Sequence, residues 1–503
     1  MTTTLALRAE RTLRLDYGLL RRVFVGFAFV CALICPMSPD PVAFALGAFV
    51  PWLIFSIIGT PTMPAPVGFF LFWQWLQTFT RVIVGQVDGE PMARSLFGPA
   101  VEDAYWFMMA SIIVLALAFR AVLGRTWPPT ERDWTAHLRW RPVDAFLVYL
   151  ASVGLTIVSA YSINVVPALY QQFDTLAKFK FAALYLLFGL VLSLGRGYGF
   201  VLAAVGLEIA MGFTGLLGEF RGAFIVLVVA AIGIRLRMTP LLLASGSAML
   251  VLLLVLGLFW TAVKTDYRNF ATGSDESQAI AVDFQDRLGF IGQRAATVSD
   301  IDWNDASYAL LVRLAYVDIF GSVVGVMNAR VEDTSMRQWG EAWSHVFQPR
   351  FLFPDKAILS DTEVYLRLTR ADPTEMVRLS TSISVGYMGE NYADLGFPKM
   401  LLGIFAIGIM MAAVVRYFMA TALPWLVREA TVMAFIVTTG YNGVEVSLPK
   451  IFGATVMFFA VYAIAVRFGY PIGLRWLDNR ANNARQQVSN AERAADASRS
   501  QRP

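Results

Sequence analysis

Two basic side chains lie in a short stretch of prolines and aromatic residues, Gln348-Pro349-Arg350-Phe351-Leu352-Phe353-Pro354-Asp355-Lys356. Proline fixes the backbone angle φ, so the two prolines predict a stiff, extended segment that presents Arg350 and Lys356. An arginine offers a planar fork for phosphate oxygens, and a lysine adds a compact positive charge. The stretch therefore predicts a contact with an anionic group, although an Arg–Asp brace that only shapes the loop fits the same spacing.

A carboxylate lies between glycines and tyrosines in a second stretch, Gly386-Tyr387-Met388-Gly389-Glu390-Asn391-Tyr392, which leads into an apolar run. A carboxyl group in a partly apolar place holds its proton more tightly and can act as an acid or a base. We therefore take Glu390 as a candidate base. The alternative is that its charge only compensates the positive end of a helix.

A third candidate is Arg221, which begins an apolar run after Leu217-Gly218-Glu219-Phe220. An ionisable side chain at membrane level is a functional candidate by default. A helix N-terminus next to an arginine favours an anionic ligand. Pairing with Glu219, or a side chain that extends to the water layer, is the alternative interpretation.

Two weaker candidates follow along the chain. Arg313 lies with Asp318 in an otherwise apolar run, Tyr308 to Met327, which we expect to form an amphipathic or partly buried helix on the membrane bundle. Arg313 is then either a candidate cation over the functional site or a charge that only supports the structure. His345 lies five residues before Arg350 and could serve as a base, although a histidine among tryptophans is also an ordinary hydrogen-bonding residue.

The supply of metal ligands is small, because the chain has only two histidines and two cysteines. A zinc site of histidine and cysteine needs three or four ligands close together, and haem or iron–sulfur ligation is equally unfavoured. We therefore predict neither a metal nor another cofactor. The net charge of +4 is too small to indicate nucleic acid binding.

Composition indicates that these residues are carried by membrane helices. Hydrophobic residues make up 57% of the 503 residues and charged residues only 16%, whereas soluble domains have about 45–50% and about 25%. This excludes a soluble globular enzyme, a disordered chain and a single-pass receptor. Apolar runs long enough to be spans predict about twelve helices, at residues 20–37, 42–59, 66–85, 104–123, 143–162, 181–196, 198–216, 221–236, 239–262, 398–419, 425–445 and 450–469.

The arginines of the short loops predict the orientation, because cytoplasmic loops carry an excess of positive charge. With the N-terminus inside, the loops after the fourth and eighth spans and the tail are all cytoplasmic. The arginines that support this are Arg125, Arg132, Arg139, Arg141, Arg235, Arg237, Arg475, Arg480, Arg485, Arg493, Arg499 and Arg502. Both termini are then cytoplasmic.

Four regions follow from this topology: a membrane bundle of about nine spans at 1–262, a long outer loop at 263–397, about three spans at 398–470, and a tail at 471–503 that we expect to be disordered or loosely helical. Lys264 to Phe397 carries 19 acidic and 12 basic residues, while the whole chain has 37 acidic and 41 basic ones. The few cations of this loop therefore stand out against an acidic background.

The order of the motifs resembles the bacterial O-antigen and exopolysaccharide repeat-unit polymerases (Wzy-type), within the wider family that includes O-antigen ligases. The resemblance is carried by Arg221-Gly222, by Pro349 to Lys356, and by Gly389-Glu390-Asn391-Tyr392 with Gly396. Two positions of the middle motif depart from the family pattern, Phe353 in place of tryptophan and Ala357 in place of a second proline. The ligase branch carries a histidine in a different local context from His345, which favours a polymerase.

The resemblance implies an all-α polytopic fold of the glycosyltransferase C-like kind in the bacterial inner membrane. It implies a metal-independent transfer of a glycan from undecaprenyl pyrophosphate to the terminal sugar of another lipid-linked unit, at the periplasmic face, with a chain-length co-polymerase as a candidate partner. On this interpretation the catalytic residues are Arg221, Arg350, Glu390 and His345, and the substrate-binding residues are Lys356, Arg313, Tyr387 and Tyr392. A ligase with another acceptor, and a transporter or flippase of lipid-linked sugars, are the alternatives.

Overall fold

The computed structural model describes residues 13–60, 62–95, 98–124, 131–166, 169–214, 220–273, 281–328, 336–348, 353, 360–372 and 383–500. Within these residues all regular structure is helical, apart from an isolated bridge between Arg14 and Arg237. The helices are, in chain order, α1 (Tyr17–Ile34), α2 (Pro41–Ile58), α3 (Ala65–Asp88), α4 (Ala100–Leu123), α5 (Glu131–Thr135), α6 (Pro142–Val165), α7 (Tyr170–Ala177), α8 (Phe179–Leu194), α9 (Tyr198–Thr214), α10 (Arg221–Gly233), α11 (Pro240–Thr272), α12 (Phe284–Ala296), α13 (Trp303–Leu314), α14 (Val317–Asn328), α15 (Arg337–Phe347), α16 (Asp361–Thr369), α18 (Gly386–Leu395), α19 (Met400–Met419), α20 (Trp425–Gly440), α21 (Leu448–Ile464) and α22 (Tyr470–Ser500).

Eight segments of the described chain are long and apolar enough to cross a membrane, which confirms a multi-pass helical membrane protein. They are Tyr17–Met37, Pro41–Ile58, Ala100–Leu123, Pro142–Ser162, Gln171–Leu194, Pro240–Thr272, Met400–Met419 and Leu448–Arg493. Each of the twelve predicted spans coincides with a helix, but α9, α10 and α20 have fewer than 18 residues, and α3 carries several polar side chains. The number twelve therefore stays a prediction.

Proline and side-chain caps explain where several of these helices begin. Pro41, Pro142 and Pro240 are the first residues of α2, α6 and α11. Proline suits this position because its fixed φ is helical and its missing N–H is not needed there. The carboxylate of Asp16 accepts a hydrogen bond from the Leu19 N–H at 2.8 Å and so caps α1. The sequence thus marks the helix starts locally, before any tertiary contact.

One large core holds most of the bundle together. Helix α4 packs against α19, α14 and α2, and α8 packs against α20, α10 and α6. The buried residues of this core come from helices throughout the chain, from Ala28 on α1 to Leu477 on α22. The first and last thirds of the chain therefore fold as one unit.

The region predicted as an outer loop packs onto this bundle. Helix α15 lies on α21, and α18 lies on α14 and α19. The carboxylate of Asp394 accepts hydrogen bonds from the N–H groups of Gln338 and Trp339, at 3.2 and 2.9 Å, so α18 caps the start of α15. The predicted boundary at 262/263 lies inside α11, which continues to Thr272.

The apolar run Tyr308–Met327 was predicted as one helix, and that prediction is wrong. The structure divides it into α13 and α14, which meet at an angle of 50°. Helix α14 buries Phe320, Val323 and Val324 and packs against α4, whereas α13 packs against α3 and α11. The two halves turn apart because each has its own packing partners.

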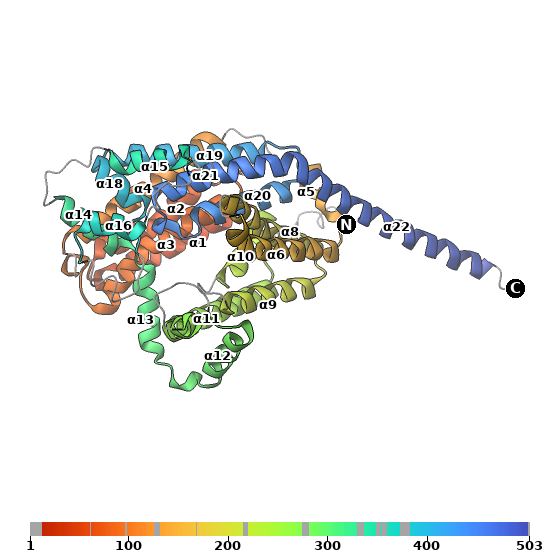
Figure 1. Ribbon diagram of the computed structural model, residues 1–503, viewed down its shortest axis with the longest axis horizontal. Helices are drawn as coiled ribbons and strands as arrows, with labels where there is room; N and C mark the ends of the chain where they lie inside the picture. Colours follow the sequence, from red (N-terminus) through yellow and green to blue (C-terminus); the bar gives the residue numbers. More distant parts are fainter. Residues whose placement is uncertain are drawn as a thin grey trace, which may run out of the picture.

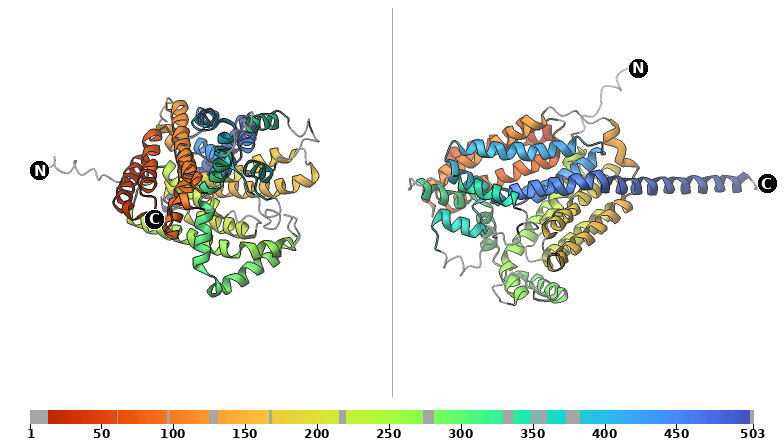
Figure 2. Two further views of the ribbon diagram at one scale, coloured as in Figure 1. Left: turned by 90° about the vertical axis from the view of Figure 1, so that its left-hand side faces the viewer. Right: turned by 45° about the horizontal axis from the view of Figure 1, so that its top comes forward.

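A second, smaller layer is formed by α9, α11, α12 and α13 (Figures 1 and 2). Its core is an aromatic cluster, which we call the α11 cluster and which consists of Phe213, Phe220, Phe224, Phe259, Trp260, Val263, Tyr267 and Ala271. Helix α11 buries residues in this cluster from Phe259 onward, and Met249, Leu253 and Leu256 of its middle turns are partly buried against it. In its most apolar 18-residue window none of its residues is buried.

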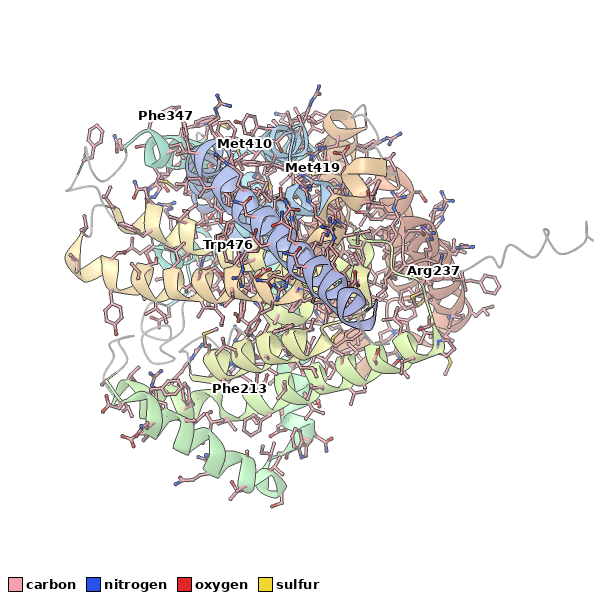
Figure 3. All side chains as sticks on the ribbon, turned by 90° about the vertical axis from the view of Figure 1, so that its right-hand side faces the viewer. Phe213, Arg237, Phe347, Met410, Met419 and Trp476 are labelled. Atoms are coloured by element: carbon pink, nitrogen blue, oxygen red, sulfur yellow. The ribbon has the colours of Figure 1, made fainter. Side chains whose placement is uncertain are left out.

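Residues 470–500 of the tail form the helix α22. A π-helical turn at residues 465–469 joins α21 to α22, which extends away from the bundle (Figures 1 and 2). Its first turns are fixed to α6 and the residues just before it: Arg480 Nε donates to Asp144 at 3.0 Å, and Trp140 Nε1 donates to Asp478 at 2.7 Å. Trp476, labelled in Figure 3, lies on the same turns.

The pair Asp144–Arg480 predicts unequal effects of its two partners on stability. The carboxylate of Asp144 is fully buried, whereas the Arg480 side chain is 46% exposed. Arg480→Met leaves a buried charge whose other cation, Arg141 Nε, is 3.8 Å away, and should lower the free energy of unfolding by about 2–3 kcal/mol. Asp144→Asn leaves a cation in water and should cost about 1 kcal/mol or less. Thermal unfolding in detergent measures both, and a larger loss for Asp144→Asn would contradict the argument.

Candidate functional site

Arg221 is the first residue of α10 and lies beside the middle of α3. Its Nε donates to the Tyr441 hydroxyl at 3.0 Å, and its Nη2 donates to Asn442 Oδ1 at 3.3 Å. Its guanidinium lies over the rings of Tyr441 and Trp73, with centroid distances of 4.7 and 5.8 Å. Among the described residues no carboxylate forms an ion pair with Arg221. Its guanidinium is therefore held in place by neutral groups, and its charge acts on the carboxylate of Glu445.

The length of α10 explains the depth of this arginine. Helix α10 has 13 residues, about 20 Å, whereas the apolar part of a bilayer is about 30 Å thick. Its C-terminal Gly233 lines the same small cavity as Ala65, the first residue of α3. Since α10 runs back along α3 from there, Arg221 lies level with Trp73 and does not reach the far end of α3.

A short turn after α20 is held against α3 and carries a second charged group. Gln77 Nε2 donates to Glu445 Oε1 and to the Asn442 carbonyl, both at 3.2 Å, and Gln77 Oε1 accepts from the Val444 N–H at 3.0 Å. Gly443 has φ +67, and a Cβ there would lie 1.8 Å from Gln77 Oε1. Only glycine allows this approach, so the turn fixes Glu445 beside α3.

A second arginine acts on this carboxylate, and the same arginine also acts on two basic residues of α11. The charges of Arg313 on α13 and of Arg221 both act on Glu445, and the charge of Arg313 also acts on Lys264 and Arg268 of α11. Burial raises the pKa of Glu445, and the two arginines oppose that rise. We call Arg221, Lys264, Arg268 and Arg313 the cation cluster. The cluster holds four basic side chains, and Glu445 is the carboxylate on which two of them act.

The residues that carry the cation cluster are anchored in an apolar core. Phe220, Val263 and Tyr267 belong to the α11 cluster and directly precede Arg221, Lys264 and Arg268 in the sequence. The rings of Phe213 and Phe220 stack with centroids 4.7 Å apart. Because the residue before each cation is buried in a common core, the three cations start from backbone positions that packing fixes.

The sequence-predicted residues fall into separate places. Arg221 and Arg313 join the cation cluster, while Arg350 and Lys356 lie outside the described residues. His345 lies on α15, which packs against α21 and α18. Asp318, the predicted neighbour of Arg313, pairs instead with Arg81 of α3, at 2.8 Å.

The structure places Glu390, Tyr387 and Tyr392 inside the protein, where they support packing. Glu390 is 1% exposed, and its Oε2 accepts from the Leu448 N–H at 2.6 Å, which caps the start of α21. The Tyr387 hydroxyl donates to Gln74, and the Tyr392 hydroxyl donates to Asn328 at 2.7 Å. In this conformation no sugar ring can stack on the buried tyrosines, and a substrate hydroxyl cannot reach Glu390.

The buried position of Glu390 predicts a pH-dependent stability. Burial, with smaller contributions from Asp361, Asp394 and Glu341, raises the pKa of Glu390 from 4.5 to about 8, and the Leu448 N–H opposes the rise. The folded state then holds the proton more tightly than the unfolded state, so stability is lost as the pH rises from 4.5 to 8.

Glu390→Gln should remove this loss, because the amide oxygen can still accept from Leu448 and cannot ionise. We expect wild type and variant to melt together near pH 4.5 and the variant to be more stable near pH 9, by on the order of 2–4 kcal/mol. Thermal unfolding measured across the pH range tests this. Parallel curves for the two proteins would show that Glu390 does not titrate as described.

Sequence reasoning missed Glu445, Gln77, Lys264 and Arg268 as site residues. Residues 425–445 were predicted as one span, but α20 ends at Gly440, so Glu445 lies in a turn and not in a span. A usable signal was present on α3, where Gln74, Gln77, Thr78 and Arg81 repeat at helical spacing within a predicted span. Polar residues at membrane depth mark functional or buried polar faces.

The arrangement can bind an anion and accept a proton, and it offers no metal site. In the part of the chain that the structure describes, no three His, Cys, Asp or Glu side chains lie close enough together to hold a metal ion. No family model, curated protein or solved structure matches the chain. Function therefore has to be inferred from the chemistry of the site itself.

Proposed function

We propose that the protein polymerises oligosaccharide repeat units linked to undecaprenyl pyrophosphate, by moving the growing glycan onto the terminal sugar of a new lipid-linked unit. The cation cluster around Glu445, held beside membrane-crossing helices, is the observation that carries this proposal. The leaving group of the transfer is a lipid pyrophosphate, and cations fixed in advance stabilise the charge that develops on it. The order of motifs that resembles Wzy-type polymerases supports the same reaction class.

The reaction exchanges a glycosyl phosphate bond for a glycosidic bond. The bond between the anomeric carbon of the donor glycan and its pyrophosphate oxygen breaks, and the bonding electrons stay on the pyrophosphate. The acceptor hydroxyl oxygen bonds to the same anomeric carbon, and its proton passes to a carboxylate. We assign the role of proton acceptor to Glu445, because its side chain is only half-buried and the charges of Arg221 and Arg313 act on it. Arg350 and Lys356 remain predicted additional cations.

The topology belongs to the same proposal. We place the cation cluster toward the periplasmic face of a bacterial inner membrane, in a glycosyltransferase C-like fold of about twelve spans with both termini in the cytoplasm. The arginines of the short loops support this orientation. The acidic outer segment around Arg313 fits it as well, since the few cations there have to bind anionic substrate against a background of negative charge.

Reconstitution tests the proposal directly. Repeat units should accumulate on their lipid carrier in cells that lack the gene, and can be extracted from them. Full-length protein in phospholipid vesicles, supplied with these units, should produce a ladder of longer lipid-linked glycans and release undecaprenyl pyrophosphate. A single transfer onto a different lipid, without a change in glycan length, would instead indicate a ligase.

Transport of lipid-linked sugars is the alternative function that one observation favours. Arg221 lies beside the middle of α3, and transporters keep their charged sites near the middle of the bilayer. In the vesicle assay a transporter would move repeat units between the two leaflets without lengthening them. That outcome, with no release of undecaprenyl pyrophosphate, would overturn the polymerase proposal.

A further inference from the structure

Helix α11 is exposed to lipid around most of its circumference. Its apolar window contains no buried residue, and Leu241, Leu243, Leu250 and Val251 are all more than half exposed. Met249, Leu253 and Leu256, on one face of its middle turns, are partly buried against the α11 cluster, and most of the remaining surface of this length is exposed. A lipid chain can therefore approach the α11 cluster from within the bilayer.

An apolar cavity of about 260 Å³ lies where α11 meets α9, α12 and α13. It is lined by Phe213, Val255, Leu256, Phe259, Ile291, Ala295, Val298 and Trp303. Figure 3 labels Phe213 near the end of α9, where its ring contacts Phe259 at a centroid distance of 5.9 Å. A dry apolar cavity of about 150 Å³ already accepts a benzene-sized group, so this one can take a longer stretch of hydrocarbon.

The cavity and the cation cluster share one helix. Phe259 lines the cavity and Lys264 follows it by five residues, about 7.5 Å along α11. Phe213 stacks on Phe220, the residue before Arg221. On α13, Trp303 lines the cavity and Arg313 belongs to the cation cluster. The cavity and the cation cluster thus lie along the same helices, with Lys264 about 7.5 Å beyond Phe259 on α11 and Arg313 about 15 Å beyond Trp303 on α13.

We propose that this cavity holds the isoprenoid segment next to the diphosphate of a polyprenyl diphosphate, whose phosphates lie on the cation cluster. The inference rests on the proposed function and specifies where the lipid of the donor is bound. A diphosphate brings two or more negative charges on one compact group, which matches the charge of the cluster better than a phospholipid with a single negative charge. The aromatic and branched lining fits a branched, unsaturated chain.

Photo-crosslinking of the full-length protein tests the site without any sugar. The probe is geranylgeranyl diphosphate with a photoreactive diazirine on its first isoprene unit, added to protein in vesicles that contain phosphatidylglycerol. We expect adducts at Val255–Phe259 of α11, at Ile291 and Ala295 of α12, and at Val298 just after α12. Unlabelled geranylgeranyl diphosphate should compete, and additional phosphatidylglycerol should not.

Substitutions give the matched comparison. Ala295→Trp fills the cavity and should lower the yield of adducts by about 10-fold or more, and Val255→Trp on α11 should do the same from the opposite wall. Leu243→Trp places the same indole on an exposed part of α11 away from the cavity and should leave the yield unchanged. Thermal unfolding shows that all three variants are folded.

Two results would overturn the site: equal competition by phosphatidylglycerol, or adducts spread over other apolar helices and unaffected by Ala295→Trp. The outcome is independent of glycan transfer. If adducts map to the cavity while the vesicle assay yields no polymer, the lipid site stands and the polymerase proposal fails. If polymer forms while adducts lie elsewhere, the polymerase proposal stands and this site fails.

Discussion

Replacing Arg221 by Gln should slow glycan transfer by about 100-fold or more, the usual cost of losing one preorganised charge at a developing anion. The partners of Arg221 are the Tyr441 hydroxyl, the Asn442 side chain and two aromatic faces. These contacts are all to neutral groups, and we expect the guanidinium to act on the leaving pyrophosphate. The rate of undecaprenyl pyrophosphate release in vesicles measures the effect.

Two further variants separate charge from geometry. Arg221→Lys keeps the charge but loses the planar fork that bonds to Tyr441 and Asn442, and should retain an intermediate rate. Arg94→Gln removes an exposed arginine just beyond the end of α3, which pairs with Glu90 at 3.2 Å, and should leave the rate unchanged. A normal rate for Arg221→Gln, or an equal loss for Arg94→Gln, would refute the role of Arg221.

Arg221 could be found from the sequence because its position alone makes it unusual. A basic residue at the start of an apolar run, on the outer side of the membrane where cations are rare, is a functional candidate whatever the tertiary structure. Lys264 and Arg268 offered no such signal, since they follow the longest apolar run as ordinary flanking charges. Only the crossing of α11 and α13 brings them to Arg313, and this crossing depends on contacts between distant segments.

The sequence likewise predicts some parts of the fold and not others. Apolar runs and proline starts predict the helices one by one, because both act within the segment itself. The bend between α13 and α14 is different: each half is a good helix, and the choice between one helix and two is made by α4 and α3 on either side. Local sequence patterns also could not predict the buried position of Glu390, because its hydrogen-bond partner, the Leu448 N–H, is 58 residues away.

Glu445→Gln should lower the transfer rate by about 100-fold to 10,000-fold, the range expected when a general base is removed. The amide can still accept the hydrogen bond from Gln77 Nε2, so the turn after α20 should keep its place. The wild-type rate should rise with pH through the raised pKa of Glu445, since only the carboxylate accepts a proton. The residual rate of the variant should lack this rise, which a purely structural role would not cause.

Two other carboxylates decide whether the effect is specific. Glu90→Gln removes an exposed charge beyond the end of α3 and should leave both rate and pH profile unchanged. Glu390→Gln distinguishes the two candidate bases, because the sequence motif assigns the proton transfer to Glu390 and the geometry assigns it to Glu445. If Glu390→Gln abolishes transfer while folding normally and Glu445→Gln does not, the outer segment must rearrange to expose Glu390 during the reaction. If the losses are reversed, the base lies on the turn that Gln77 holds against α3, beside the cations that bind the leaving group.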